Sequence, residues 1–330
     1  MAWLRSLGSV TVGPAAYRRI TLVALVLLVA IIVTGAAVRL TDSGLGCTDW
    51  PTCDGTTIVP RAEYHQLIEG VNRLFTGLVS AAIALAVLGS LRRTPRRADL
   101  TVLALGLVAG VIGQIVLGGL TVLFHLWPPL VMGHLVLSLT LVTCAMVLHQ
   151  RAAWPETAAA DREGWAMPAR RHPAVGGDVR VLSRWLLVAG AVLVLTGTMV
   201  TGAGPHGGDP EADRLPLDML QIVRVHGIAM VVFLGGVVVA LGRLARTRAP
   251  AAVRRAGATL VTVLVAQAGV GYLQYFTNVP PLLVGIHVFG ATLVWMALIN
   301  FQLQLATPAA VAAPVTAGAT SHAPVAVASR

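Results

Sequence analysis

Lysine is absent from this chain of 330 residues, and charged residues of all kinds make up only 12% of it. So little charge excludes an ordinary soluble domain, in which charged residues contribute about a quarter. Hydrophobic residues reach 56%, a proportion typical of a protein that crosses a membrane several times. Without lysine, arginine carries the positive charge, and its distribution alone indicates the orientation of the chain.

Cysteine is also scarce, with three residues in the whole chain. Cys47 and Cys53 lie in one short segment with no histidine close by, and this irregular spacing excludes the usual zinc-binding pairs. Cys144 stands alone in an apolar stretch, where a thiol packs like a small apolar side chain.

Eight apolar stretches are long enough to cross the hydrocarbon core as helices, which takes about 20 residues. They cover residues 20–38, 65–90, 100–124, 129–150, 182–202, 220–242, 256–276 and 281–302. The sequence therefore predicts an all-α integral membrane protein with eight transmembrane helices.

Arginine alternates with acidic residues along the connecting loops. It clusters in residues 5–19, 92–97, 151–184 and 243–255. Basic loops stay on the cytoplasmic side, so we expect a protein of the cell (plasma) membrane with both termini cytoplasmic. This topology explains the net charge of +10, and no nucleic-acid partner is expected. Cys47 and Cys53 then lie on the oxidising side, where we expect a disulfide that is either a structural staple or redox-active.

An internal repeat relates the two halves of the chain. Gln114 precedes His134 by the same spacing as Gln267 precedes His287, and a Pro-Pro-Leu turn precedes each histidine. Each half contains an even number of spans, so the two halves have the same orientation in the membrane. They are then related by an axis along the membrane normal. The predicted fold is two tandem pseudo-symmetric four-helix bundles. The expected organisation is a cytoplasmic segment at 1–19, a first bundle at 20–150, a cytoplasmic linker at 151–181, a second bundle at 182–302 and a disordered cytoplasmic tail at 303–330.

The second half places two histidines at one depth. His226 and His287 each lie about six residues from the outer end of a helix, which corresponds to roughly 9 Å. Two imidazoles that face each other within a helix bundle form a bis-histidine haem site. The alternative is a pair of buried histidines that are satisfied by hydrogen bonds.

The first half has only one matching histidine, His134, since the counterpart of His226 is Asn72. A haem iron with a single histidine keeps an open position, and Asn72 is compatible with such an opening. His65 lies about 10 Å farther along the same helix, which makes it a less suitable ligand.

Glu69 lies on the same predicted helix face as His65 and Asn72. A carboxylate within an apolar span is costly unless it is paired or takes part in chemistry, so Glu69 is a candidate site residue. Arg73 is its candidate partner, and in that case the pair would only hold the helix in the bundle.

These residues together resemble the pattern of haem A synthases, membrane enzymes that oxidise a methyl group of haem O to a formyl group. The resemblance covers nearly all of residues 20–302. It includes an outer loop with two cysteines, single histidines on the fourth, sixth and eighth helices, and a Glu-x-x-His-Arg element at Glu69 to Arg73. Asn72 departs from this element, which commonly has histidine there. The resemblance implies a resident haem b between His226 and His287.

The resemblance also implies a reaction and partners. Successive hydroxylations of the C8 methyl of haem O would give haem A for terminal oxidases, with Glu69 in proton transfer. The substrate haem would lie among His134, Asn72, Arg73 and His65, with His134 on its iron. Expected partners are haem O synthase and an electron donor, either a quinol or a thiol-redox protein, besides membrane lipid; a homo-oligomer is also compatible.

Two other classes of protein share part of this pattern. A b-type electron-transfer cytochrome would need the second-half histidine pair alone. A haem transporter would release unmodified haem, and its halves would move relative to each other. The unequal halves favour the enzyme, with one resident haem and one exchanged substrate.

Overall fold

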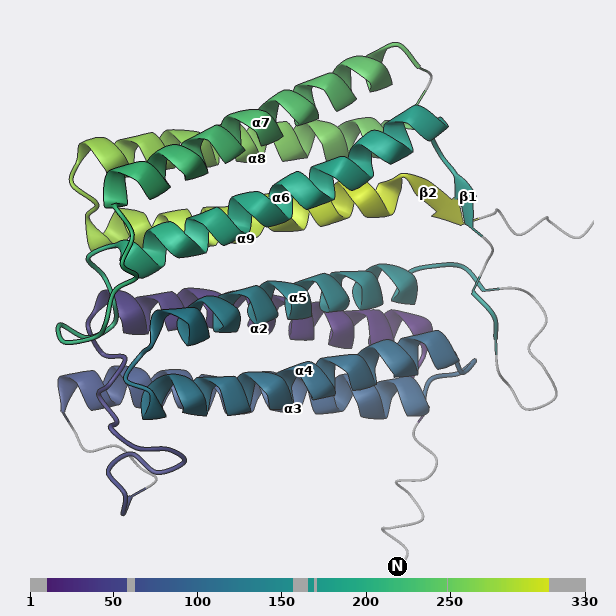
Figure 1. Cartoon of the computed structure of the whole chain (residues 1–330). Coiled ribbons are helices and arrows are strands. Elements are labelled where there is room, and N and C mark those ends of the chain that lie inside the picture. The colour runs from purple at the N-terminus through teal and green to yellow at the C-terminus, as the bar shows by residue number, and fades with distance from the viewer. Residues whose placement is uncertain (1–10, 58–62, 157–165, 169–170, 248, 309–330) are drawn as a thin grey trace, which may run out of the picture.

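The computed structural model describes residues 11–57, 63–156, 166–168, 171–247 and 249–308, which contain eight long helices and two short strands. Labelled as in Figure 1, these are α2 (Pro14–Leu40), α3 (Tyr64–Leu91), α4 (Ala98–Leu123), α5 (Pro128–Ala152), β1 (Arg171–Pro173), α6 (Gly177–Ala203), α7 (Met219–Ala245), α8 (Ala251–Phe276), α9 (Pro281–Gln304) and β2 (Ala306–Pro308). All eight helices are long and apolar enough to span a membrane. The predicted all-α membrane fold is confirmed.

Several helices extend beyond the spans predicted from the sequence. α2 begins at Pro14 rather than at residue 20, and α6 begins at Gly177 rather than at residue 182. An apolar run measures only the part of a helix that lies in hydrocarbon. Backbone hydrogen bonding continues into the interfacial region, where polar side chains are solvated. Part of the predicted N-terminal segment and part of the predicted linker are therefore helical.

The two strands join the segments that were predicted as linker and tail. β1 pairs with β2 in antiparallel register, with Arg171 opposite Pro308. Residues 303–308 therefore differ from the predicted disordered tail, because the end of α9 and the β1–β2 ladder satisfy their backbone groups. Residues 309–330 of that predicted tail lie outside the described residues.

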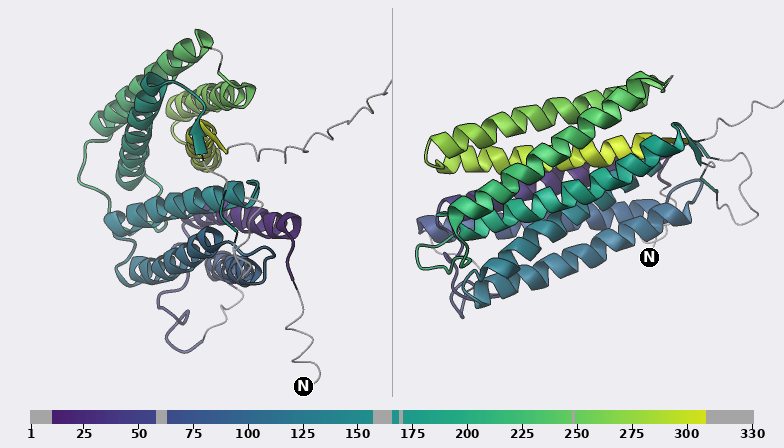
Figure 2. Two further views of the ribbon diagram at one scale, coloured as in Figure 1. Left: turned by 90° about the vertical axis from the view of Figure 1, so that its right-hand side faces the viewer. Right: turned by 45° about the horizontal axis from the view of Figure 1, so that its top comes forward.

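The helices form two four-helix bundles that stack on each other (Figures 1 and 2). In the first bundle α2 and α4 each pack against both α3 and α5, so that α3 and α5 face each other diagonally. In the second bundle α6 and α8 each pack against both α7 and α9, which form the corresponding diagonal pair. This shared connectivity confirms the predicted pseudo-symmetric repeat.

Each bundle has its own apolar core, and the bundles meet through α2, α5, α6 and α9. Leu107 is fully buried in the first core and Phe233 in the second. Across the interface, Trp295 on α9 donates a hydrogen bond from Nε1 to Thr143 Oγ1 on α5, at 2.9 Å. A polar bond within an apolar contact fixes the position of α9 against α5.

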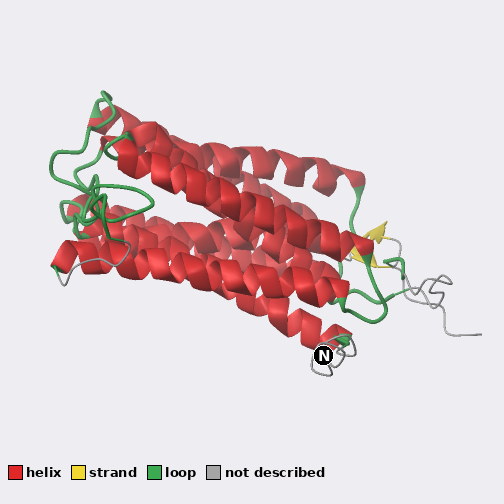
Figure 3. Cartoon of the chain, turned by 90° about the horizontal axis from the view of Figure 1, so that it is seen from below, coloured by secondary structure: helices red, strands yellow, loops and turns green. Residues whose placement is uncertain are grey.

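The loops gather at the two ends of the bundles (Figure 3). One end, which we call the cysteine end, carries the α2–α3, α4–α5, α6–α7 and α8–α9 connections. The other end, the arginine end, carries the α3–α4, α5–α6 and α7–α8 connections. There Arg97 is fully buried and donates to both carboxylate oxygens of Asp99, at 3.0 and 2.8 Å. The arginine-rich loops, which are separated along the sequence, thus lie together at one end of the bundles.

Candidate functional site

The second bundle presents its two histidines on the diagonal helices α7 and α9. His226 on α7 has its Nδ1 atom 3.1 Å from Thr196 Oγ1. On α9 the backbone carbonyl of His287 accepts a hydrogen bond from Gln267 Nε2 at 2.8 Å. A hydrogen bond to one ring nitrogen fixes the orientation of an imidazole and leaves the other nitrogen to ligate. Thr196 therefore leaves Nε2 of His226 available for a metal.

Both of these histidines lie against a glycine. A Cβ atom added at Gly197 would lie 3.1 Å from His226 Cε1, and one added at Gly271 would lie 3.1 Å from His287 Cε1. This pairing of glycine with histidine was not predicted from the sequence. A signal was present, since Gly197 follows Thr196 in a dipeptide that recurs at Thr34-Gly35.

The first bundle repeats the environment of His287 around His134. Gln114 donates from Nε2 to the His134 carbonyl at 3.1 Å and to Ser138 Oγ at 2.6 Å. A Cβ atom added at Gly118 would lie 3.2 Å from His134 Nε2. His134 on α5 and His287 on α9 are therefore held alike, on helices that pack against each other between the bundles.

Asn72 takes the place of His226 in the first bundle. The hydroxyl of Thr34 donates to Asn72 Oδ1 at 2.8 Å, just as Thr196 contacts His226. Asn72 is on α3, diagonally across the bundle from His134 on α5. Asn72 and His134 therefore lie on diagonal helices of the first bundle, as His226 and His287 do in the second.

His65 lies apart from this position. It is at the start of α3, it is exposed, and its Nδ1 atom is 2.9 Å from Ser43 Oγ in the α2–α3 loop. This contact holds the imidazole at the cysteine end of the bundle, away from Asn72.

Glu69 contacts the loop that contains the disulfide. Its side chain is buried, Oε2 accepts a hydrogen bond from the Cys47 amide at 2.7 Å, and Oε1 accepts one from Arg73 Nε at 3.0 Å. Arg73 Nη2 also lies 2.7 Å from Oε1. Both carboxylate oxygens are therefore occupied, and the cost of burying the charge is offset by an ion pair and a backbone donor.

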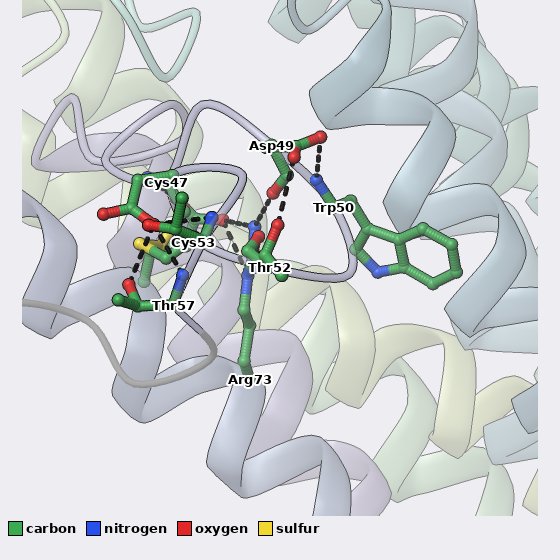
Figure 4. Close-up of a disulfide and its surroundings, with 10 residues drawn as sticks. Cys47, Asp49, Trp50, Thr52, Cys53, Thr57 and Arg73 are labelled. Atoms are coloured by element: carbon green, nitrogen blue, oxygen red, sulfur yellow. Dashed lines mark hydrogen bonds and ion pairs between the residues drawn. A yellow bond between two sulfur atoms is a disulfide. The ribbon is translucent and has the colours of Figure 1, made fainter.

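Arg73 extends this anchor along the loop (Figure 4). Its guanidinium donates to the Thr52 carbonyl at 3.0 Å and to the Asp49 carbonyl at 3.1 Å. Cys47 and Cys53 form a disulfide at the base of the same loop, and both are buried. The pair of Glu69 and Arg73 thus binds a disulfide-closed loop rather than only another helix, which the sequence did not indicate.

The same loop also reaches α4. A Cβ atom added at Gly119 would lie 2.7 Å from Trp50 Cδ2, so the indole rests on the glycine backbone. The loop therefore covers the cysteine end of the first bundle between α3 and α4.

Farther along the same loop, hydrogen bonds from the Thr57 amide and hydroxyl lower the pKa of Asp54 below its ordinary value, and this carboxylate stays ionised.

The histidine environments fit haem. Within the described part of the chain, no group of three or more His, Cys, Asp or Glu residues is placed to hold a metal ion. A metal held by His226 and His287 would therefore take its remaining ligands from outside these residue types, as the iron of a haem does from its macrocycle. The buried Nδ1 atom of His287 has no hydrogen-bond partner among the described residues, which is compatible with a site completed by a bound group.

Comparison with known proteins gives the family. The sequence profile of the cytochrome oxidase assembly protein family, COX15-CtaA, matches residues 18–205, more than half of the chain. The chain belongs to this family. The matched stretch spans the first bundle except the first turn of α2, together with the linker and α6 of the second bundle.

Curated relatives support this assignment. The chain is 35% identical to a haem A synthase of Lysinibacillus sphaericus over 28% of its own length and 31% of the relative's. It is 30% identical to a haem A synthase of Shewanella oneidensis over 40% of its length and 44% of the relative's. A protohaem IX farnesyltransferase of Thermus thermophilus is 42% identical over 19% of this chain and 10% of the relative. The chain thus spans less than half the length of each of these relatives, and the resemblance to haem A synthases is confirmed at the level of the family.

Proposed function

We propose that this protein is a haem A synthase, which oxidises the C8 methyl of haem O to a formyl group by successive hydroxylations. The observation that carries the proposal is the inequality of two otherwise matching sites. The second bundle offers two histidines on its diagonal helices, whereas the first offers His134 and Asn72. A haem held between two histidines is fixed at both axial positions, whereas a haem held by one histidine keeps a position open for reaction.

In the second bundle His226 and His287 would hold a resident haem b. That cofactor would supply single-electron transfer. Thr196 orients the His226 ring and Gln267 holds the backbone of His287. Gly197 and Gly271 leave space for the two rings, so the bundle positions both ligands before the cofactor binds.

In the first bundle His134 would hold the iron of haem O. Glu69 is our candidate for proton transfer at its carboxylate oxygens during hydroxylation. The same carboxylate binds the Cys47 amide and Arg73, so its proton transfer is coupled to the position of the disulfide loop. Burial of both cysteines favours the structural staple over a disulfide that a redox protein reaches directly.

The partners follow from the proposed reaction. Haem O synthase would deliver the substrate, and the match to a protohaem IX farnesyltransferase supports a place in the same pathway. The electrons would come from a quinol or a thiol-redox protein. We place the protein in the plasma membrane with the arginine end and both termini in the cytoplasm, because basic loops are retained there.

The test is to co-express the chain with a source of haem O, purify it, and identify each bound haem by extraction, chromatography and mass spectrometry. We expect haem b together with haem A or a hydroxylated haem O. His226→Ala should lose the haem b, and Glu69→Gln should lower the yield of oxidised product. Haem b alone in the presence of abundant haem O would favour an electron-transfer cytochrome instead. Unmodified haem O that is bound and released would indicate a transporter.

A further inference from the structure

Three of the four positions that could ligate a haem iron share one arrangement, in which an imidazole lies against the backbone of a glycine. The pairs are Gly118 with His134, Gly197 with His226, and Gly271 with His287. In each pair a Cβ atom on the glycine would approach the ring to 3.1 or 3.2 Å. The ring therefore fills the space that the missing side chain leaves.

The fourth position has the glycine but not the ring. Gly35 follows Thr34 on α2 as Gly197 follows Thr196 on α6, and both threonines contact the residue across from them. A Cβ atom added at Gly35 would meet no atom within 4 Å. The space that His226 fills in the second bundle is therefore open in the first, because the amide of Asn72 is shorter than an imidazole.

The polarity of the Asn72 amide follows from its hydrogen bond. Thr34 Oγ1 lies 2.8 Å from Asn72 Oδ1 and 3.2 Å from the Ile31 carbonyl, so its single proton goes to the nearer acceptor. Within the described part of the chain, the Asn72 amide nitrogen has no hydrogen-bond partner. This nitrogen, with its two protons, is the atom that Asn72 offers to a molecule in the open space.

We propose that Gly35, Thr34 and Asn72 form the distal side of the substrate site. The space over Gly35 admits a diatomic molecule to the iron of the bound haem, and Asn72 donates a hydrogen bond to that molecule from Nδ2. Thr34 is the positioning residue that fixes the amide by its bond to Oδ1, and His134 is the single axial ligand from the protein. This inference rests on the proposed function, since it requires haem in the first bundle.

Carbon monoxide bound to the reduced protein tests the inference by a readout other than activity. An iron between two histidines does not accept carbon monoxide, so the gas reports on the first bundle alone. A hydrogen bond from Asn72 lowers the C–O stretching frequency in the infrared spectrum. A single neutral hydrogen bond should also make carbon monoxide dissociate roughly two- to tenfold more slowly than from a site without this donor.

Three substitutions separate the parts of the site. Asn72→Leu keeps the shape and removes the donor, so the C–O frequency should rise and carbon monoxide should dissociate two- to tenfold faster. Thr34→Val should broaden or split the C–O band, because the amide loses its fixed orientation. Asn72→His should fill the space over Gly35 and abolish carbon monoxide binding, with a second low-spin six-coordinate haem in the spectrum. The matched control is Thr198→Val, because Thr198 is also a threonine within a transmembrane helix, but it donates to the Leu195 carbonyl and lies in the other bundle. This variant should leave the band unchanged.

The outcomes distinguish this inference from the proposed function. Extraction of the same sample reports whether haem O or its oxidised product is present beside haem b, and its absence would refute both. Two haems with no carbon monoxide binding in the unaltered protein would mean a sixth protein ligand in the first bundle. That result, or a C–O frequency that Asn72→Leu leaves unchanged, would overturn the distal role of Asn72 and leave the enzyme assignment standing.

Discussion

Glu69 should determine how firmly the disulfide loop is held, whatever its part in proton transfer. Glu69→Ala removes the acceptor for the Cys47 amide and the counter-ion of Arg73. A hydrogen bond to a charged group contributes about 1.5–3 kcal/mol. The ion pair adds less, because the Arg73 side chain is 27% exposed. We therefore expect a loss of about 2–3 kcal/mol in the free energy that keeps the loop closed, which is roughly a 30- to 160-fold increase in local opening.

Hydrogen exchange at the Cys47 amide, followed by mass spectrometry in lipid nanodiscs, measures this opening directly. Glu69→Gln keeps a neutral acceptor for the amide and should raise exchange only about tenfold, because one hydrogen bond of about 1 kcal/mol is retained. The matched control is Glu63→Gln, since Glu63 is exposed at the start of α3 and its side chain caps nothing. Unchanged protection of the Cys47 amide in Glu69→Ala would refute the anchoring role.

Two further predictions concern the packing around the histidines and between the bundles. Gly271→Ala places a methyl group 3.1 Å from His287 Cε1 and should weaken haem binding in the second bundle roughly tenfold, as judged by titration of the low-spin spectrum. Gly269→Ala on the same helix meets no atom within 4 Å and should bind haem normally, so equal loss in both variants would contradict the close-approach argument. Trp295→Phe should lower the free energy of unfolding by about 1 kcal/mol through loss of the bond to Thr143. Thr143→Val should cost a similar amount, and the double variant should cost no more than either alone; additive losses would show that the bond contributes little.

Much of the architecture could be predicted because it depends on local patterns. The length of an apolar run sets the length of a span. Arginine in alternate loops indicates that these loops lie at the same end of the bundles. The spacing from Gln114 to His134 and from Gln267 to His287 predicted the repeat, and in the structure each glutamine binds the carbonyl of its histidine. These features can be predicted from the sequence, because they concern residues on consecutive helices that are joined by a short turn.

The helix ends and the strands were harder to predict. Apolar runs do not include the polar turns at either end of α2 and α6, so the helices are longer than the predicted spans. The pairing of β1 with β2 joins segments far apart in the sequence. Neither segment has a composition that indicates a strand.

The sequence by itself determined the eight spans, the two related halves, and the inequality between Asn72 and His226. Only the tertiary structure decided what these residues contact. It placed Glu69 on the Cys47 amide, Thr34 on Asn72, and an open space over Gly35 where the second bundle has an imidazole. Periodicity fixes which face of a helix a residue occupies, but the residue that meets this face comes from a distant helix or loop. That choice depends on how the whole bundle packs.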